Sequence, residues 1–520
     1  MLVANQPLPP GLPIACVGLH MSNTIRLIAP PSLTPDLLRH AILAGWPKGI
    51  SKETIDYGLR SFRLSGAPWH RDVLGASSTL VVSIIRTFAS RGWRLLTCVC
   101  SSTKTSAVDS LYFVQAVPAQ PRLFAMCLPF ADKVHLKGDI ETGDSVAIRT
   151  ALRDAVIAAW PPGLQREIIE RDEYVVKLKQ YPWKSSLCAT PKVRSVLSQI
   201  IHSFATIGYR LVNTCAQTCG FDEDRWPMVD IWIFQHDAGM LEQLPSYDEA
   251  HGGAGSSSMP AAPAGVPASL VPRQSGRRIA SITIVSGDML EIVAPPDVAP
   301  PIIDIVNALW RRGIKRITPA QPLELPAKSG KQLADLSDVA TTLKMYGYPW
   351  SCSGDEEIMA QQLLLEIYAH MRRIGWRLLA VPHVCRVNMD THPSFFEPCS
   401  PAQSLEMFML SPANPNKLNL IHNPSVIHEK TLAVVVQAVN ATITALPGSN
   451  AMTKQRGGVV EWTLSELDWK PNGAATMWNR VMIVNLLQTV LGLGFELYTA
   501  CFADASIDPI DSLVFIRVPG

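Results

Sequence analysis

Charged residues are scarce in this sequence of 520 residues. They make up 17% of the chain, whereas about 25% is usual for a soluble domain. The 46 basic and 44 acidic side chains nearly cancel, which leaves a formal net charge of +2. This balance excludes a strongly basic protein that coats nucleic acid, and it excludes an acidic disordered chain. We therefore expect no nucleic-acid partner.

Long apolar runs are also missing. No stretch of 18 or more apolar residues occurs, so we expect no membrane-spanning helix. The N-terminus has no basic segment and is interrupted by Pro7, Pro9, Pro10 and Pro13, which is unlike a secretory signal. Hydrophobic residues still make up 47% of the chain, enough for a large core. The sequence predicts a cytoplasmic protein and leaves a nuclear location open.

Short motifs that are typical of catalytic or metal-binding sites are absent as well. The sequence has no GxSxG, HExxH, GxxxxGK[ST] or GxGxxG pattern, and its 11 cysteines include no CxxC pair. We predict that the protein binds no metal and no cofactor, and the sequence identifies no catalytic residue. A site in only one part of the chain stays possible at this point.

What the sequence does contain is one pattern repeated four times. Each copy has a tryptophan after proline or aspartate, then a helical apolar pattern, then glycine, an aromatic residue, any residue and leucine. The tryptophans are Trp69, Trp183, Trp350 and Trp469, and the glycines are Gly92, Gly208, Gly375 and Gly494. The separations are 23, 25, 25 and 25 residues. Such constant spacing indicates internal repeats.

The repeated residues are predicted to have structural roles. A tryptophan that recurs once per copy is typical of a seam between helix and sheet, so we expect burial. The glycine is expected to end a helix in a left-handed conformation. A short run ending in Phe113, Phe234, Phe408 or Phe515 follows, and we interpret it as the last strand of each copy. Its first residue, Asp109, Asp230, Ser404 or Asp511, is expected to cap a turn.

The periodicities predict an α+β fold of four tandem modules with the element order β-α-β-α-β-β. We place the modules at residues 22–117, 122–236, 279–411 and 417–520, with an insertion near 317–336 in the third. Residues 237–277 form a Gly/Ser/Pro/Ala-rich linker that is predicted to be disordered. The chain then divides into two pseudo-symmetric lobes of two modules each.

Two resemblances accompany this pattern. The Pro-Trp, Gly-aromatic-x-Leu and terminal Phe residues are similar to modules of uncharacterised eukaryotic proteins, which imply no activity. The linker segment Leu244, Pro245, Ser246 and Tyr247 resembles the ligands of WW domains, and this resemblance implies docking in an aromatic groove.

These observations lead to one expectation and two alternatives. We expect a non-enzymatic intracellular scaffold that binds protein partners through its four repeats. The first alternative is an enzyme or small-molecule binder with a cleft between paired modules. The second is a ubiquitination adaptor that a WW-domain protein binds through Leu244, Pro245 and Tyr247. The sequence specifies neither the ligand nor the oligomeric state.

Overall fold

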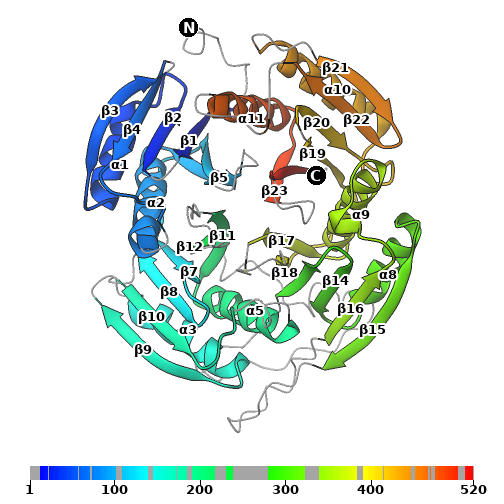
Figure 1. Ribbon diagram of the computed structural model, residues 1–520, viewed down its shortest axis with the longest axis horizontal. Coiled ribbons are helices and arrows are strands. Elements are labelled where there is room, and N and C mark those ends of the chain that lie inside the picture. Colours follow the sequence, from blue (N-terminus) through cyan, green and yellow to red (C-terminus); the bar gives the residue numbers. More distant parts are fainter. Residues whose placement is uncertain are drawn as a thin grey trace, which may run out of the picture.

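The computed structural model shows four copies of one α+β module (Figure 1). The residues that the structure describes are 12–20, 23–56, 58–70, 73–100, 108–138, 144–170, 173–183, 190–216, 230–237, 279–322, 339–382, 384, 391–413, 415–446, 451–465, 469, 475–501 and 510–518. The linker motif with Leu244, Pro245 and Tyr247 lies outside them, as do residues 323–338 of the third module.

The first module has six strands and two helices. They are β1 (Ile14–His20), β2 (Thr24–Ile28), α1 (Pro35–Gly45), β3 (Ile50–Asp56), β4 (Leu59–Leu64), α2 (Leu74–Ala89), β5 (Trp93–Val99) and β6 (Ser110–Gln115). The strands form an antiparallel sheet in the order β3-β4-β2-β1-β6-β5. Strand β5 is therefore one edge of the sheet and β3 is the other.

The other modules repeat this order of elements. The second has β7 (Leu123–Cys127), β8 (Lys133–Gly138), α3 (Ser145–Ala159), β9 (Leu164–Glu170), β10 (Glu173–Leu178), α5 (Pro191–Thr206), β11 (Tyr209–Ala216) and β12 (Asp230–His236). The third has β13 (Ala280–Val285), β14 (Met289–Ala294), α8 (Ala299–Leu309), β15 (Ile314–Pro322), β16 (Val339–Met345), α9 (Asp355–Arg373), β17 (Trp376–Ala380) and β18 (Thr391–Pro398). The fourth has β19 (Glu406–Ala413), β20 (Lys417–Ile421), α10 (Glu429–Thr444), β21 (Ala451–Arg456), β22 (Val459–Leu464), α11 (Ala475–Gly492), β23 (Glu496–Cys501) and β24 (Ser512–Arg517).

The predicted element order was therefore too short, because each module has six strands rather than four. A hairpin opens the module, and a second hairpin separates the two helices. Strand β1 was missed because all seven of its residues are buried, so it shows no alternation between apolar and polar positions. Strand β3 was missed for the opposite reason, since its sequence ISKETID is mostly polar.

The terminal Phe of the third module was also assigned wrongly. Phe408 lies in β19, the first strand of the fourth module. The last strand of the third module is β18, where Phe396 pairs with Leu378 as Phe113 pairs with Leu95 in the first module. The Gly-aromatic-x-Leu strand and the Phe strand are thus neighbours in every sheet.

The four modules form a closed ring in which sheets and helix layers alternate (Figure 1). Helix α2 packs against β5 of its own sheet and against β7 and β8 of the next module. In the same way α5 contacts β13 and β14, α9 contacts β19 and β20, and α11 contacts β1. The last contact joins the fourth module to the first. The predicted pairing into two lobes is not shown, because each module contacts the next through the same elements.

The repeated tryptophans are buried in all four modules, and the repeated glycines share one backbone conformation. The indoles of Trp69, Trp183, Trp350 and Trp469 are at most 1% exposed. Two of them donate a hydrogen bond to a backbone carbonyl, from Trp183 Nε1 to Lys133 O at 3.1 Å and from Trp469 Nε1 to Lys417 O at 2.6 Å. The backbone φ angles of Gly92, Gly208, Gly375 and Gly494 lie between +80° and +86°. This left-handed conformation turns the chain from the long helix into the inner strand.

In the described part of the chain, no helix combines the length and the apolar character that crossing a membrane requires.

Candidate functional site

The inner edges of the four sheets meet at the ring axis. Strands β5, β11, β17 and β23 are each an edge strand of their sheet, and they contact one another around the centre (Figure 1). Each has a β-bulge at the same place, directly after the leucine of the Gly-aromatic-x-Leu pattern. The bulged residues are Leu96, Val212, Leu379 and Tyr498, and all four line one cavity. Bulges redirect side chains. Here Leu96, Leu379 and Tyr498 also pack against apolar clusters shared with the preceding module, whereas Val212 is 38% exposed.

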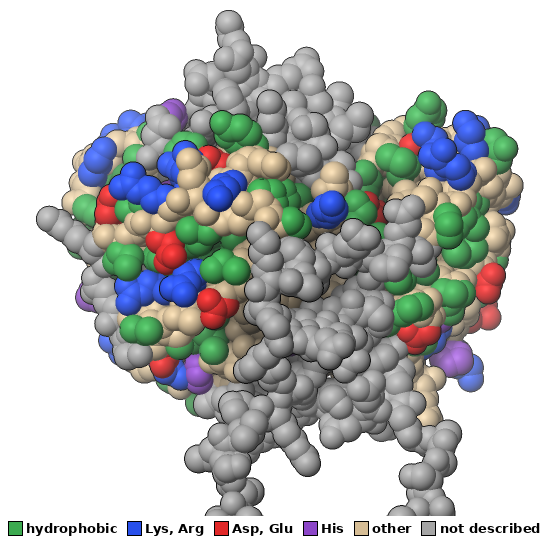
Figure 2. Space-filling view, turned by 90° about the horizontal axis from the view of Figure 1, so that it is seen from below, with side chains coloured by type: hydrophobic (Ala, Val, Ile, Leu, Met, Phe, Trp, Pro, Cys, Tyr) green, Lys and Arg blue, Asp and Glu red, His purple; other side chains and the backbone are tan. Residues whose placement is uncertain are grey.

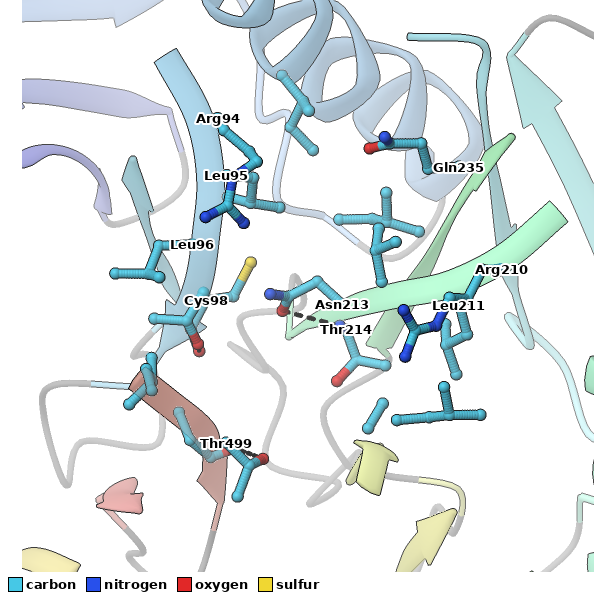
Figure 3. Close-up of a pocket in the computed structure, with 18 of the residues that line it drawn as sticks. Arg94, Leu95, Leu96, Cys98, Arg210, Leu211, Asn213, Thr214, Gln235 and Thr499 are labelled. Carbon is cyan, nitrogen blue, oxygen red and sulfur yellow. Dashed lines mark hydrogen bonds between the residues drawn. The ribbon is translucent and has the colours of Figure 1, made fainter. Parts of the chain in front are cut away.

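This axial cavity has a volume of about 380 Å³, and residues of all four modules line it (Figure 3). Its size falls in the range of about 300–1,000 Å³ that is usual for small-molecule sites. Polar side chains from the second module form part of the wall, namely Asn213, Thr214 and Gln235. The amide of Thr214 donates a hydrogen bond to Asn213 Oδ1 at 2.9 Å, which fixes that side chain.

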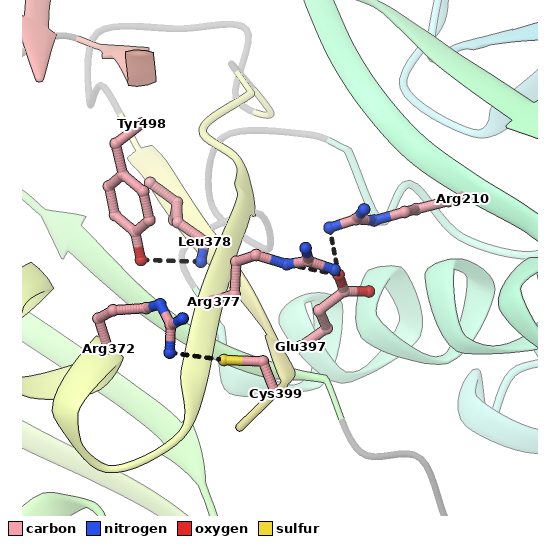
Figure 4. A network of polar contacts seen from close by, with 7 residues as sticks. All are labelled: Arg210, Arg372, Arg377, Leu378, Glu397, Cys399 and Tyr498. Carbon is pink, nitrogen blue, oxygen red and sulfur yellow. Dashed lines mark hydrogen bonds and ion pairs between the residues drawn. The ribbon is translucent and has the colours of Figure 1, made fainter. Parts of the chain in front are cut away.

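The residue two positions after each repeated glycine is charged in all four modules. These residues are Arg94, Arg210, Arg377 and Glu496. Arg210 and Arg377 both bind the carboxylate of Glu397, which is only 5% exposed (Figure 4). The bond from Arg377 Nε to Glu397 Oε1 is 3.1 Å long. Because Glu397 belongs to β18 and Arg210 to β11, this ion pair also joins the second module to the third.

Arg94 and Arg210 both line the cavity, but their surroundings differ. Burial lowers the pKa of Arg210, and the opposite charge of Glu397 counteracts this effect. Its Nε atom is buried and has no hydrogen-bond partner among the described residues. Arg94 is exposed on the cavity wall, and no hydrogen bond or ion pair joins it to any described residue.

Aspartates lie at the opposite ends of the inner strands, where they join neighbouring modules. Asp109 Oδ2 accepts a hydrogen bond of 2.7 Å from the amide of Ala216 in the second module. Asp511 Oδ2 accepts one of 2.6 Å from the amide of Cys100 in the first module. In both pairs the aspartate amide also donates to the carbonyl of the same partner residue. We expected these aspartates to cap a turn; their Oδ2 atoms bind the neighbouring module.

A hydroxyl performs a similar task between the third and fourth modules. The amide of Leu378 donates to the hydroxyl oxygen of Tyr498 at 3.0 Å (Figure 4). Leu378 is on the edge strand β17, so this contact occupies a backbone group of the sheet edge. Burial raises the pKa of Tyr498, so the hydroxyl stays protonated at neutral pH.

A buried polar position that the sequence did not reveal joins the modules behind the cavity. It lies 14 residues before each repeated glycine, on the long helix, and is at most 4% exposed. Its residues are Ser78, Arg194, Gln361 and Arg480. We overlooked it because its residue type changes from copy to copy, whereas a search for repeats looks for identity. The fixed distance to the glycine could have revealed it.

Each residue of this position meets the first strand of the next module. Ser78 Oγ lies 4.0 Å from Cys127 Sγ, Arg194 Nε donates to Thr283 Oγ1 at 3.3 Å, and Gln361 Nε2 donates to Ser411 Oγ at 3.0 Å. At the fourth contact the strand residue is Gly18, where an added Cβ would lie 2.8 Å from Arg480 Nε. We call these four contacts the junction pairs. The glycine leaves room for the arginine side chain.

The two arginine junctions have contrasting electrostatics. Beside Arg194, burial raises the pKa of Glu291 to about 7, although the arginine partly opposes the shift. Beside Arg480, burial and the charges of Arg480 and Arg26 hold the pKa of His20 far below its usual value. The neutral His20 therefore accepts a hydrogen bond from Arg480.

The described cysteines are thiols outside any disulfide bond, and all but Cys352 are buried. Burial raises the pKa of Cys98 well above its ordinary value and that of Cys501 to about 12. Such thiols are poor nucleophiles at neutral pH. In the part of the chain that the structure describes, no group of three or more His, Cys, Asp or Glu residues could hold a metal ion.

Comparison with known proteins identifies a family. The family model of an uncharacterised domain matches the chain four times, at residues 13–114, 123–235, 278–397 and 406–516. These segments coincide with the four sheets. No curated protein matches the chain.

Proposed function

Because the chain belongs to the family of this uncharacterised domain, present here in four copies, we propose its function from its own cavity. The protein is a binding protein whose ring holds a small molecule at the axis. The observation that carries this proposal is that one cavity of about 380 Å³ is lined by the bulged residue of each of the four modules. This combines the expected non-catalytic role with the alternative of a site between modules.

The arrangement of the inner strands supports a binding role. Edge strands carry backbone groups that are free to bond, and the four edges lie around a single space. The side chains on the wall include hydrocarbon groups such as Leu96 and Val212 and polar groups such as Asn213 and Gln235. Ligand sites combine these two kinds of surface, since apolar contacts supply area and a few polar groups fix orientation.

A cavity-filling variant tests the proposal. A small-molecule library is screened by thermal shift against the full chain, and hits are measured again on Val212→Trp. Val434→Trp is the matched control, because Val434 is 52% exposed on α10 and is not among the residues that line the cavity. We expect Val212→Trp to abolish binding and Val434→Trp to preserve it. Ligands that bind both variants equally well would place the binding site elsewhere.

Protein partners remain a second proposal, carried by the sequence. The resemblance to WW-domain ligands at Leu244, Pro245 and Tyr247 supports docking of such a domain, and a cytoplasmic location would be compatible with it. On the face that Figure 2 draws, basic and acidic side chains are interspersed with apolar ones, which suits contacts of low net charge. Binding of a WW domain should be lost in Tyr247→Ala; unchanged binding would remove this idea.

A further inference from the structure

The two ends of the axial cavity differ in charge. Arg94 and Arg210 stand near the beginning of β5 and β11, whereas the aspartates meet the ends of these strands. Six residues separate the two levels, one of them in the bulge, which corresponds to roughly 17 Å along a strand. Asp109, Asp230 and Asp511 all line the cavity at that level, and the carboxylates of Asp109 and Asp511 accept backbone amides. The arginine end is thus electrostatically separate from the aspartate end.

We propose that the axial cavity binds a small molecule through a carboxylate or phosphate group, which Arg94 and Arg210 hold between them. This inference rests on the proposed function and names the class of ligand. The two arginines occupy equivalent positions on neighbouring inner strands, and both line the cavity (Figure 3). A guanidinium group donates two parallel hydrogen bonds to a carboxylate or a phosphate, which favours such ligands over neutral ones.

The balance of charges at this end favours an anion. Arg210 and Arg377 share the single carboxylate of Glu397, and Asp237 is the other acidic group that acts on Arg210. Arg94 adds a third guanidinium without an acidic partner among the described residues. Of the charged residues at this end, Arg94, Arg210 and Asp237 line the cavity, so two cations face one carboxylate there. The fourth equivalent residue, Glu496, is exposed and is not among the residues that line the cavity.

Unused donors point to the same ligand. All donors of Arg94 are available on the described cavity wall, whereas Arg210 Nε is buried and cannot be reached from the cavity. An oxyanion between the two side chains would accept from both. Asn213 and Gln235 also line the cavity, and they are suited to bind the neutral part of such a molecule.

Titration calorimetry on the full chain tests the inference. The probes are citrate for the carboxylate class and pyrophosphate for the phosphate class, at constant ionic strength. We expect at least one probe to bind, and we expect Arg94→Met and Arg210→Met each to weaken it roughly tenfold or more. Arg311→Met is the control, because Arg311 is exposed just after α8 and is not among the cavity-lining residues.

The outcomes separate the inference from the proposed function. Because Arg210→Met also breaks an ion pair between modules, Arg94→Met decides the result if the other variant unfolds. Equal affinity of the wild-type chain and Arg94→Met for both probes overturns the inference, as does absence of binding by either probe at millimolar concentration. If neutral molecules still bind and Val212→Trp still blocks them, the proposed function is retained and only the preference for an anionic ligand is rejected. If no ligand depends on Val212, the proposed function fails as well.

Discussion

At Gly18, an added Cβ atom would lie 2.8 Å from Arg480 Nε, closer than real Cβ contacts allow. Arg480 cannot easily move away, because Nε donates to Ser110 Oγ at 2.6 Å and Nη2 donates to Leu19 O at 3.0 Å. A buried arginine is thus accommodated by the absence of a side chain on the facing strand. The same position pairs Gln361 with Ser411 in the contact between the third and fourth modules.

This suggests transplanting one junction pair onto another. We predict that Gly18→Ser and Arg480→Gln each destabilise the full chain by about 1–3 kcal/mol, the first by overpacking and the second by loss of buried hydrogen bonds. The double variant recreates the pair of Gln361 and Ser411. Its loss of unfolding free energy should therefore be clearly smaller than the sum of the losses in the two single variants. Urea unfolding in a double-mutant cycle measures this coupling. Strictly additive losses would mean that the two residues do not act as a pair.

Glu291 provides a prediction about pH. Its pKa rises from 4.5 to about 7 in the folded chain because of burial. Between these values the folded state binds more protons than the unfolded state, so this residue's contribution to stability falls as pH rises and levels off above about pH 7. The total loss is on the order of 3 kcal/mol.

The variant Glu291→Gln should remove this dependence. Its stability relative to wild type should increase as pH rises from 5 to 8, as followed by urea unfolding at each pH. Glu429→Gln, on the exposed first turn of α10, controls for the loss of one negative charge. If the difference in unfolding free energy between wild type and Glu291→Gln stays constant from pH 5 to 8, Glu291 does not titrate as described.

At the scale of elements, the inner strands depend on aspartates of neighbouring modules. Asp511→Ala should cost about 1–3 kcal/mol, because the amide of Cys100 loses its acceptor at 2.6 Å. Hydrogen exchange should accelerate at the end of β5 before the rest of the sheet. Asp154→Ala on the exposed face of α3 is the control, since that side chain is 62% exposed. Unchanged exchange at Cys100 would argue against this contact between the fourth and first modules.

The elements also show what the sequence could predict. The long helices, the buried tryptophans and the glycines at their ends follow from periodicity and from backbone sterics, which act locally. Strand β1 escaped prediction because one face packs on the core of its own module and the other on α11 of the fourth module, and burial on both faces removes the alternating pattern. Burial of that kind depends on a neighbour that the local sequence does not reveal.

The candidate site escaped prediction for a related reason. Arg94, Arg210 and Arg377 are visible in the repeat as the variable residue of the Gly-aromatic-x-Leu pattern. Their convergence becomes apparent only once the four inner strands share an axis. The junction residues Ser78, Arg194, Gln361 and Arg480 differ in type, because each suits a different partner strand. Such complementarity is a property of pairs and is invisible in one position alone.

At the scale of the whole molecule, the linker in the sequence suggested two separate lobes, yet the described contacts do not distinguish that junction from the others. Helix α5 meets β13 and β14 across residues 238–278 as α2 meets β7 and β8 across a short connection. The contact of α11 with β1 then closes the ring. Closure gives every helix layer two sheets to pack against and creates the axial cavity.

Small-angle X-ray scattering of the full chain in dilute solution tests this closure most directly. A closed ring predicts a distance distribution with a single maximum and a radius of gyration near that of a compact chain of this length, about 24 Å. Two lobes that move independently would instead give a second maximum at longer distance and a clearly larger radius, and that result would contradict the account.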